Sequence, residues 1–216
     1  MTALTARFRF LALLIGLVLP VVGAGPARGD ILVAYDFATP TADPTERTGP
    51  GFAPAVVDAD AAATDVSLSD ALPEPGEPFI ADRDPPYGRP VLRIDPGDGS
   101  TSADDAVAGG KFFEFTVTAA GSSLALDNLT FLSARGGASM PRGWVLRSSV
   151  DGFASNIDSE EVPSVRPDLT NFTVDLSGPE FQGLPEVTFR IYTFVPAGGQ
   201  SLEYVDVTLN GIVVPD

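Results

Sequence analysis

Carboxylates dominate the chemistry that this sequence offers. The chain has 216 residues, of which 29 are Asp or Glu, and it contains neither histidine nor cysteine. Ser-His-Asp and Cys-His catalysis need an imidazole, and protein zinc sites are usually built from histidine and cysteine, so the composition excludes these classes. What remains is carboxylate catalysis, a metal ion bound through oxygen ligands, or binding without a reaction.

An acidic loop at residues 95–105 is the first candidate metal site. Its sequence, DPGDGSTSADD, combines carboxylates with glycines that let backbone carbonyl groups converge. Ca²⁺ takes about six to eight oxygen ligands of these kinds. The pattern indicates either a structural calcium site or a solvated acidic turn. The candidate ligands are Asp95, Asp98, Asp104 and Asp105.

A tryptophan and three polar neighbours form a candidate sugar-binding face. Saccharide recognition combines an aromatic ring, on which CH groups stack, with planar groups that hydrogen-bond to hydroxyls. Trp144 is the only tryptophan and lies beside a loop sequence, and Arg147, Arg190 and Tyr192 are placed to share a sheet face. These residues predict a polysaccharide-binding surface. The alternative is that Trp144 is buried in the core, as is common in sandwich folds, and that the arginines pair with carboxylates.

Carboxylate catalysis would be a different function for the same chain. A glycosidase places two carboxylates about 5 to 9 Å apart across a cleft. With 29 acidic residues such a pair can arise at many positions, and no motif identifies a nucleophile or an acid. We therefore assign no catalytic residue and expect a non-enzymatic protein, with a carboxylate-dependent polysaccharide hydrolase as the alternative.

The elements that must position these groups are β-strands. Segments rich in β-branched and aromatic residues, many with period-two alternation, recur along the chain between Gly- and Pro-rich turns. Residues 38–90 are rich in Pro, Gly, Ala and Asp, and we expect this loop-rich segment to wrap the domain with a few short strands. No amphipathic helix is expected. The principal strands are predicted at residues 31–37, 91–95, 111–118, 123–134, 143–150, 170–176, 186–195 and 203–214.

This pattern predicts an all-β fold. Many short strands without helices favour a two-sheet antiparallel β-sandwich, most simply a jelly roll of the galactose-binding or carbohydrate-binding-module kind. Residues 30–216 have the size of one domain. The buried positions Leu126 and Leu129 are three residues apart, which predicts a bulge or turn at residues 127–128.

The fold prediction suggests a second calcium arrangement. By analogy with jelly rolls of the carbohydrate-binding type, a structural Ca²⁺ would join the first strand region to the last strand. Alternatively, the aspartate in the last strand is an edge carboxylate paired with an arginine. The candidate ligands are Asp36, Asp58, Asp60 and Asp206.

The N-terminus has the pattern of an export signal. Arg7 and Arg9 precede an apolar stretch at residues 11–23, which is shorter than the roughly 20 residues of a membrane-spanning helix. We expect a signal peptide at residues 1–24, cleaved between residues 24 and 29, and no membrane span in the mature chain. The protein would be extracellular or at the cell surface. Its formal charge of −16 argues against a nucleic acid partner.

An ordered set of short phrases resembles a bacterial family. They are AYDF (34–37), FEFTVT (113–118), LDNLTF (126–131), LRSSVDGF (146–153), VDLSGPEFQGL (174–184), VTFRIYTF (187–194) and YVDVTLNGIV (204–213). Together they resemble exported β-sandwich domains often found ahead of a PEP-CTERM sorting tail. The resemblance implies a surface- or matrix-associated protein and no established reaction. The phrases are not followed by such a tail, so attachment to the surface and free secretion both stay open.

Overall fold

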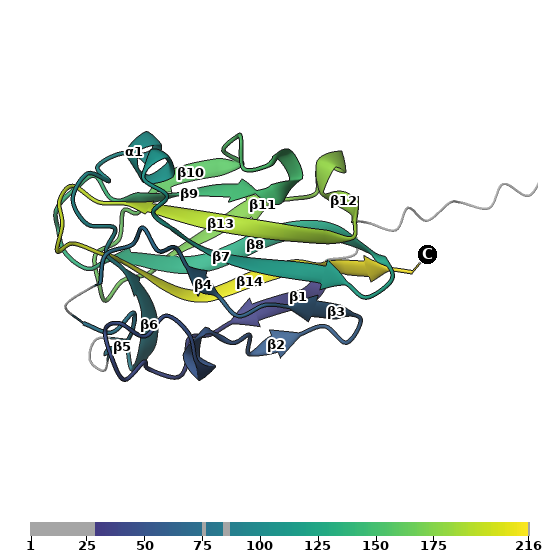
Figure 1. Cartoon of the computed structure of the whole chain (residues 1–216), viewed down its shortest axis with the longest axis horizontal. Helices are drawn as coiled ribbons and strands as arrows, with labels where there is room; N and C mark the ends of the chain where they lie inside the picture. Colours follow the sequence, from purple (N-terminus) through teal and green to yellow (C-terminus); the bar gives the residue numbers. More distant parts are fainter. Residues whose placement is uncertain (1–28, 75–76, 84–86, 216) are drawn as a thin grey trace, which may run out of the picture.

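Two antiparallel β-sheets pack face to face in the computed structural model, which describes residues 29–74, 77–83 and 87–215 (Figure 1). The predicted signal peptide at residues 1–24 lies outside the described residues. The first sheet has the order β11–β8–β14–β1–β2, with β12 on β8, β6 on β14 and β5 on β6. Its strands are β1 (Asp30–Tyr35), β2 (Val56–Val57), β5 (Ile80–Arg83), β6 (Arg89–Ile94), β8 (Ser123–Arg135), β11 (Thr170–Asp175), β12 (Gln182–Leu184) and β14 (Leu202–Val214).

The second sheet covers the inner face of the first. Its order is β10–β9–β13–β7–β3, and β4 also pairs with β7. Its strands are β3 (Ala61–Ala63), β4 (Ser67–Leu68), β7 (Phe112–Ala119), β9 (Gly143–Ser148), β10 (Asp158–Glu161) and β13 (Glu186–Phe194).

Eight of the strands pair in a nested order, whereas β6 pairs with β14 and β5 outside this set. β1 pairs with β14, β7 with β13, β8 with β11, and β9 with β10. First therefore pairs with last and second with next to last, as in one long antiparallel ribbon folded over into two sheets. This is the connectivity of a jelly roll, and the predicted all-β jelly-roll sandwich is confirmed.

Alternation along the strands builds the core. In β7, Phe113, Phe115 and Val117 are buried, whereas the residues between them are partly exposed. Aromatic rings fill much of the space between the sheets, with the Phe131 ring 5.0 Å from the Trp144 ring. Each large apolar side chain that is buried contributes about 1.5–3 kcal/mol, so this layer is a main source of stability.

The predicted irregularity in β8 is a β-bulge. Leu126 and Leu129 are both buried although a regular strand would turn them to opposite faces. The register against β14 shifts between these two positions and leaves Asp127 unpaired. The extra residue restores the inward direction of the apolar side chains.

The segment 38–90 wraps the sandwich as expected. Its short strands are β2, β3, β4 and β5, in line with the few short strands expected there. β2 extends the first sheet and β3 the second, so the segment crosses from one sheet to the other. Phe52, Val66 and Phe79 anchor it, because all three are buried in the core.

A short helix, α1 (Ala103–Ala108), was not expected from the sequence. Ser102 caps it, since its Oγ accepts a hydrogen bond from the Asp105 amide at 3.2 Å. Ala106 packs against Tyr192 and Phe194 on the outer side of the second sheet. None of the helices in the described residues has the length and apolar character needed to cross a membrane.

Candidate ligand-binding site

The predicted aromatic platform lies in the core. Trp144 is fully buried, and its ring lies edge-on to Phe131 and Phe172 at 5.0 and 5.3 Å. Tyr192 is 4% exposed, because α1 covers it and Phe112 packs against its ring. The sequence-based assignment of these two residues to a ligand surface is therefore wrong. The alternative of a core tryptophan is correct.

Arg147 and Arg190 do share a sheet face, where they lie opposite each other on β9 and β13. The Arg190 guanidinium lies 3.8 Å from the Phe153 ring centroid, and its Nε donates to Glu114 Oε2 at 2.7 Å. Arg147 Nη1 donates to the Phe153 carbonyl at 2.8 Å. Both arginines therefore hold the loop that contains Phe153 against the sheet. Arg190 also lies 4.4 Å from the Phe112 ring centroid, so its aromatic neighbours are Phe153 and Phe112 and not Trp144.

An arginine takes the place predicted for calcium between the first and last strands. Arg89 donates to both carboxylate oxygens of Asp206, at 3.0 and 2.9 Å, and to the Asp36 carbonyl at 2.7 Å. The alternative of an arginine-paired Asp206 is therefore correct. Asp58 accepts instead from the Asp60 amide. No group of three or more acidic side chains in the described residues is placed to hold a metal ion, so the four aspartates do not converge.

The acidic loop 95–105 does not gather its carboxylates either. Asp95 accepts from the Gly97 amide at 2.9 Å, and Asp98 accepts from the Gly198 amide at 2.7 Å. Asp104 and Asp105 lie in the first turn of α1, where negative charge stabilises a helix. These side chains stabilise a turn, a contact between loops and the start of a helix. The prediction that they cluster as metal ligands is therefore wrong. Calcium binding by this chain stays a prediction.

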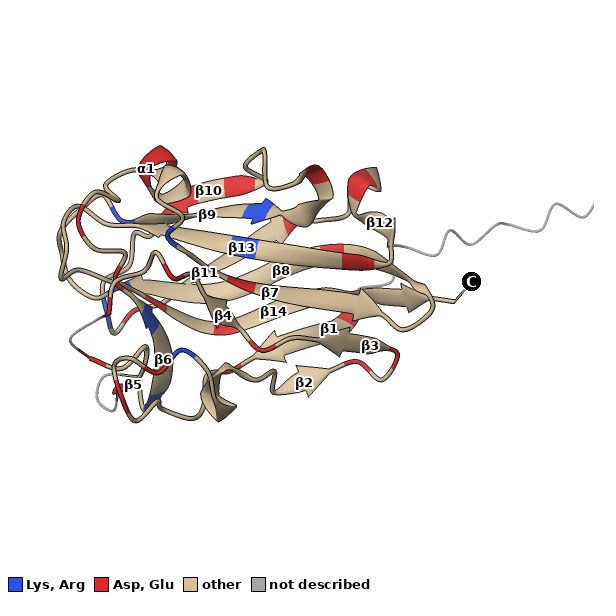
Figure 2. Cartoon of the chain, viewed as in Figure 1, with Lys and Arg blue, Asp and Glu red and all other residues tan. Residues whose placement is uncertain are grey.

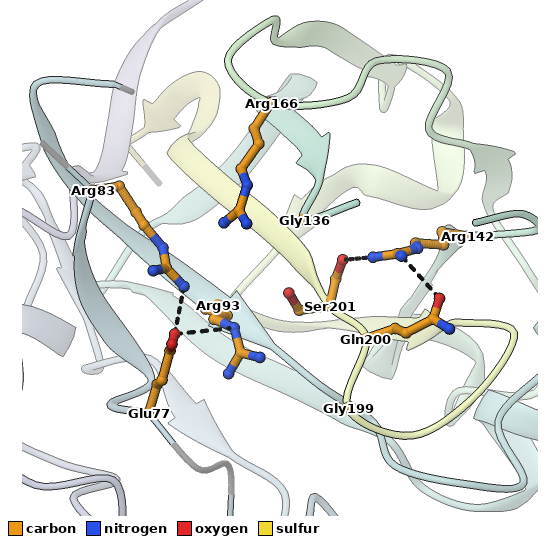
Figure 3. Close-up of a pocket in the computed structure, with 9 residues that line it drawn as sticks. All are labelled: Glu77, Arg83, Arg93, Gly136, Arg142, Arg166, Gly199, Gln200 and Ser201. Atoms are coloured by element: carbon orange, nitrogen blue, oxygen red, sulfur yellow. Dashed lines mark hydrogen bonds and ion pairs between the residues drawn. The ribbon is translucent and has the colours of Figure 1, made fainter. Parts of the chain in front are cut away.

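The sequence did not predict an arginine-lined pocket at one end of the sandwich. Figure 2 shows several basic residues gathered near β5 and β6, whereas acidic residues are spread over the molecule. The pocket has a volume of about 160 Å³, and Figure 3 shows four guanidinium groups around it. The described residues that line it are Glu77, Arg83, Arg93, Gly136, Arg142, Arg166, Gly199, Gln200 and Ser201.

A buried glutamate behind the pocket positions two of these arginines. Glu203 in β14 has a side chain with no exposed surface, and a buried carboxylate is costly unless it is paired. Arg83 Nε lies 3.4 Å and Arg166 Nη1 3.3 Å from its Oε1. The Tyr87 hydroxyl donates to its Oε2 at 2.7 Å, and burial together with this hydrogen bond raises the pKa of Tyr87.

A second glutamate lies at the mouth of the pocket. The Glu77 side chain is 53% exposed, and its Oε2 accepts from Arg83 Nη2 at 2.7 Å. The same oxygen lies 3.8 Å from Arg93 Nε. The hydrogen bond from Arg83 is the main reason why the pKa of Glu77 is lowered from its usual value.

Arg142 closes the pocket and forms no ion pair with a carboxylate among the residues that the structure describes. It is 3% exposed and donates to the carbonyls of Ser139 and Ser201 and to Gln200 Oε1, at 2.8 to 2.9 Å. Burial and the nearby Arg135 guanidinium lower the pKa of Arg142. Neutral acceptors satisfy its hydrogen bonds but leave its charge in place, so this wall of the pocket is positive.

Two buried guanidinium nitrogens of the pocket lack a hydrogen-bond acceptor in the described structure, and Arg83 Nε, which lies 3.4 Å from Glu203 Oε1, is one of them. Arg93 Nη1 is buried and has no hydrogen-bond partner among the described residues. A buried donor without a partner costs about 1–3 kcal/mol, and more when it is charged. Four arginines therefore stand against two carboxylates, Glu77 and Glu203, and the pocket keeps an excess of positive charge. The chemistry of the arrangement is the recognition of an anionic group by hydrogen-bond donors.

No protein-family model matches the chain, and no curated protein matches it significantly. Among solved structures, the arabinose-bound MgGH51 α-L-arabinofuranosidase has 12% identity and a TM-score of 0.45 over 85% of this chain, which spans only 27% of that one. The CBM22-1 xylan-binding domain of Xyn10C from Paenibacillus barcinonensis has 10% identity and a TM-score of 0.42, with 87% and 97% of the two chains covered. The K3 adhesin domain of Lys-gingipain from Porphyromonas gingivalis w83 has 17% identity and a TM-score of 0.38, with 71% and 92% covered. Because every one of these TM-scores is below 0.5, the ligand class is inferred below from this chain's own residues.

Proposed function

We propose that the protein is an exported, non-enzymatic module that binds an anionic extracellular polysaccharide through the arginine pocket. The observation that carries the proposal is the charge of the pocket. In a chain with a formal charge of −16, the described residues lining this pocket include four arginines and one carboxylate, and Glu203 behind the lining supplies a second carboxylate. Guanidinium groups recognise carboxylate and sulfate with paired hydrogen bonds, so an acidic substituent of a sugar chain suits this lining.

The size of the pocket limits what can enter it. Its volume of about 160 Å³ is small beside the roughly 300–1,000 Å³ of typical ligand pockets. One acidic group with part of its sugar ring fits such a volume, and a stretch of polymer does not. The proposed contact is therefore with a single charged substituent or a chain end.

The carboxylates of the pocket are poorly suited to acid–base catalysis. A glycosidase needs one carboxylic acid whose pKa is raised so that it holds a proton near neutral pH. Glu77 has the opposite shift, since Arg83 lowers its pKa. Glu203 is buried among Arg83, Arg166 and Tyr87, with no exposed surface for a substrate to reach. These features support binding without hydrolysis.

The hydrolase alternative has a different location. A hollow of about 360 Å³ lies between two 3₁₀ turns, η2 (Ser149–Asp151) and η3 (Pro179–Phe181), and its lining includes Asp151, Asp175 and Glu180. Hydrogen bonds from the Ser177 side chain and backbone lower the pKa of Asp175, so this carboxylate is also a poor acid. Release of reducing ends from a panel of polysaccharides would support the hydrolase and contradict the proposed function.

Binding to acidic and neutral polysaccharides tests the proposal directly. We expect the protein to be retarded in affinity gels that contain an acidic polysaccharide and to migrate freely in gels with a neutral one. Arg93→Gln and Arg166→Gln should each weaken the retardation at least fivefold, because each removes a charged donor of the type that is worth about 1.5–3 kcal/mol.

Arg147→Ala is the matched control for these two variants. It also removes an arginine, but from the outer face of the second sheet, away from the pocket lining. If retardation were lost with Arg147→Ala and kept with Arg93→Gln, the binding surface would lie on the second sheet and not at the pocket. No retardation by any acidic polysaccharide would remove the proposed function.

A further inference from the structure

The two carboxylates of the arginine pocket differ in how firmly they are held. Glu203 has no exposed side-chain surface, and its contacts come from Arg83, Arg166 and Tyr87. Glu77 has 53% of its side chain exposed and contacts only Arg83 and Arg93 among the described residues. Exposed ion pairs contribute little to stability, whereas breaking a buried pair is strongly unfavourable. Glu203 is therefore a fixed part of the pocket, and Glu77 is exchangeable.

Arg83 does not depend on Glu77 for a counterion. Its Nη2 bonds Glu77 at 2.7 Å, and its Nε lies 3.4 Å from Glu203. If the Glu77 side chain turns outward, Glu203 still neutralises Arg83, and the pocket keeps its shape. Arg93 would then lose its nearest carboxylate while one of its nitrogens already lacks an acceptor. An incoming anion would supply acceptors to both arginines.

The position of Glu77 also indicates the kind of anion. Its carboxylate lies at the pocket mouth between the guanidinium groups of Arg83 and Arg93, as Figure 3 shows. The pocket mouth therefore already holds one planar carboxylate, which is that of the Glu77 side chain. The acidic group of a uronic acid is a carboxylate of the same geometry attached to a sugar ring.

We propose that Glu77 is an internal counterion that the carboxylate of a uronate-containing polysaccharide displaces when it enters the pocket. This inference rests on the proposed function and assigns its ligand class and its affinity-limiting residue. It predicts that the affinity for the uronate increases when the negative charge of Glu77 is removed. Removing the Glu77 carboxylate frees Arg83 and Arg93 for the ligand and removes the repulsion between two anions.

The test is calorimetric titration of an oligogalacturonate into the wild-type protein, Glu77→Gln and Glu77→Ala. Both variants should bind about fivefold more tightly than wild type, because an exposed ion pair of this kind is worth up to about 1 kcal/mol. Glu160→Gln is the matched control, since it also removes an exposed negative charge outside this pocket, and its dissociation constant should equal that of wild type. The melting temperatures of all variants confirm that they fold.

The outcomes separate the inference from the function on which it rests. Wild-type binding with equal or weaker binding by Glu77→Gln and Glu77→Ala would overturn the role of Glu77 and leave the proposed function intact. A sulfated oligosaccharide of equal charge that binds more tightly than the uronate would overturn the assignment of the ligand class. Absence of binding in wild type and both variants would overturn the proposed function together with the inference.

Discussion

Glu203 shows how one buried charge organises a surface. Its carboxylate cannot be solvated, so the fold brings Arg83, Arg166 and Tyr87 to it. Those two arginines carry more positive charge than Glu203 neutralises, and the excess lies at the pocket. A residue that never contacts the ligand would thus set the charge that the ligand meets.

Replacing Glu203 with glutamine should destabilise the protein. Glu203→Gln keeps the shape of the side chain but leaves Arg83 and Arg166 without their buried counterion, so we expect the free energy of unfolding to fall by about 3 kcal/mol. Urea denaturation followed by tryptophan fluorescence measures this, because Trp144 lies in the core. Glu160→Gln, on the exposed strand β10, should change the free energy of unfolding by less than about 0.5 kcal/mol. Equal effects of the two substitutions would contradict the structural role of Glu203.

At the scale of elements, local periodicity predicts the strands well. It predicts poorly which other segments pack on the outer faces of the sheets. β7 and β13 alternate because each has one face in the core, and this pattern is visible in the sequence. α1 has six residues, too few for a helical period to emerge from a segment rich in Asp, Gly and Ser. Because α1 was not predicted, Tyr192 was assigned to an exposed face: alternation turns this residue outward, and α1 together with Phe112 buries it there.

The capping contact of α1 can be tested by itself. Ser102→Ala removes the side-chain acceptor of the Asp105 amide, and loss of such a cap usually costs about 1 kcal/mol. We expect a decrease of that size in the free energy of unfolding from urea titrations. Ser159→Ala, on β10 without a side-chain hydrogen bond in the described structure, should have an effect below about 0.5 kcal/mol. A Ser102→Ala variant as stable as wild type would show that packing alone holds α1 in place.

At the scale of the whole molecule, the jelly-roll topology assembles the pocket. Arg83 and Arg93 come from the consecutive strands β5 and β6, whereas Arg142 and Arg166 come from segments far away in sequence, and no spacing among the four forms a motif. They meet because β6 pairs with β14 and because the loops next to β8, β9 and β14 lie at the same end of the sandwich. Strand positions can therefore be predicted from local patterns, whereas this site depends on long-range pairing that no local pattern contains.

The net charge of the molecule predicts an unusual salt dependence for the proposed binding. The acidic surface repels a polyanion over long distances, whereas the arginines of the pocket attract it at contact. The Debye length falls from about 30 Å at 0.01 M to about 10 Å at 0.1 M salt, so added salt first screens the long-range repulsion. Retardation by an acidic polysaccharide should therefore increase between about 0.01 and 0.1 M NaCl and decrease toward about 1 M, where the Debye length is about 3 Å. A steady decrease from the lowest salt would mean that the positive pocket dominates at every distance.

The guanidinium of Arg89 has a consequence for the environment in which the protein works. It links the Asp36 carbonyl to the Asp206 carboxylate, and it belongs to a residue of β6. Polyuronates collect divalent cations around their carboxylates, so a domain that relied on a diffusible ion at this junction would compete for that ion with the ligand that we propose. An arginine cannot be extracted by a chelating gel. This junction would stay closed in a matrix depleted of free calcium.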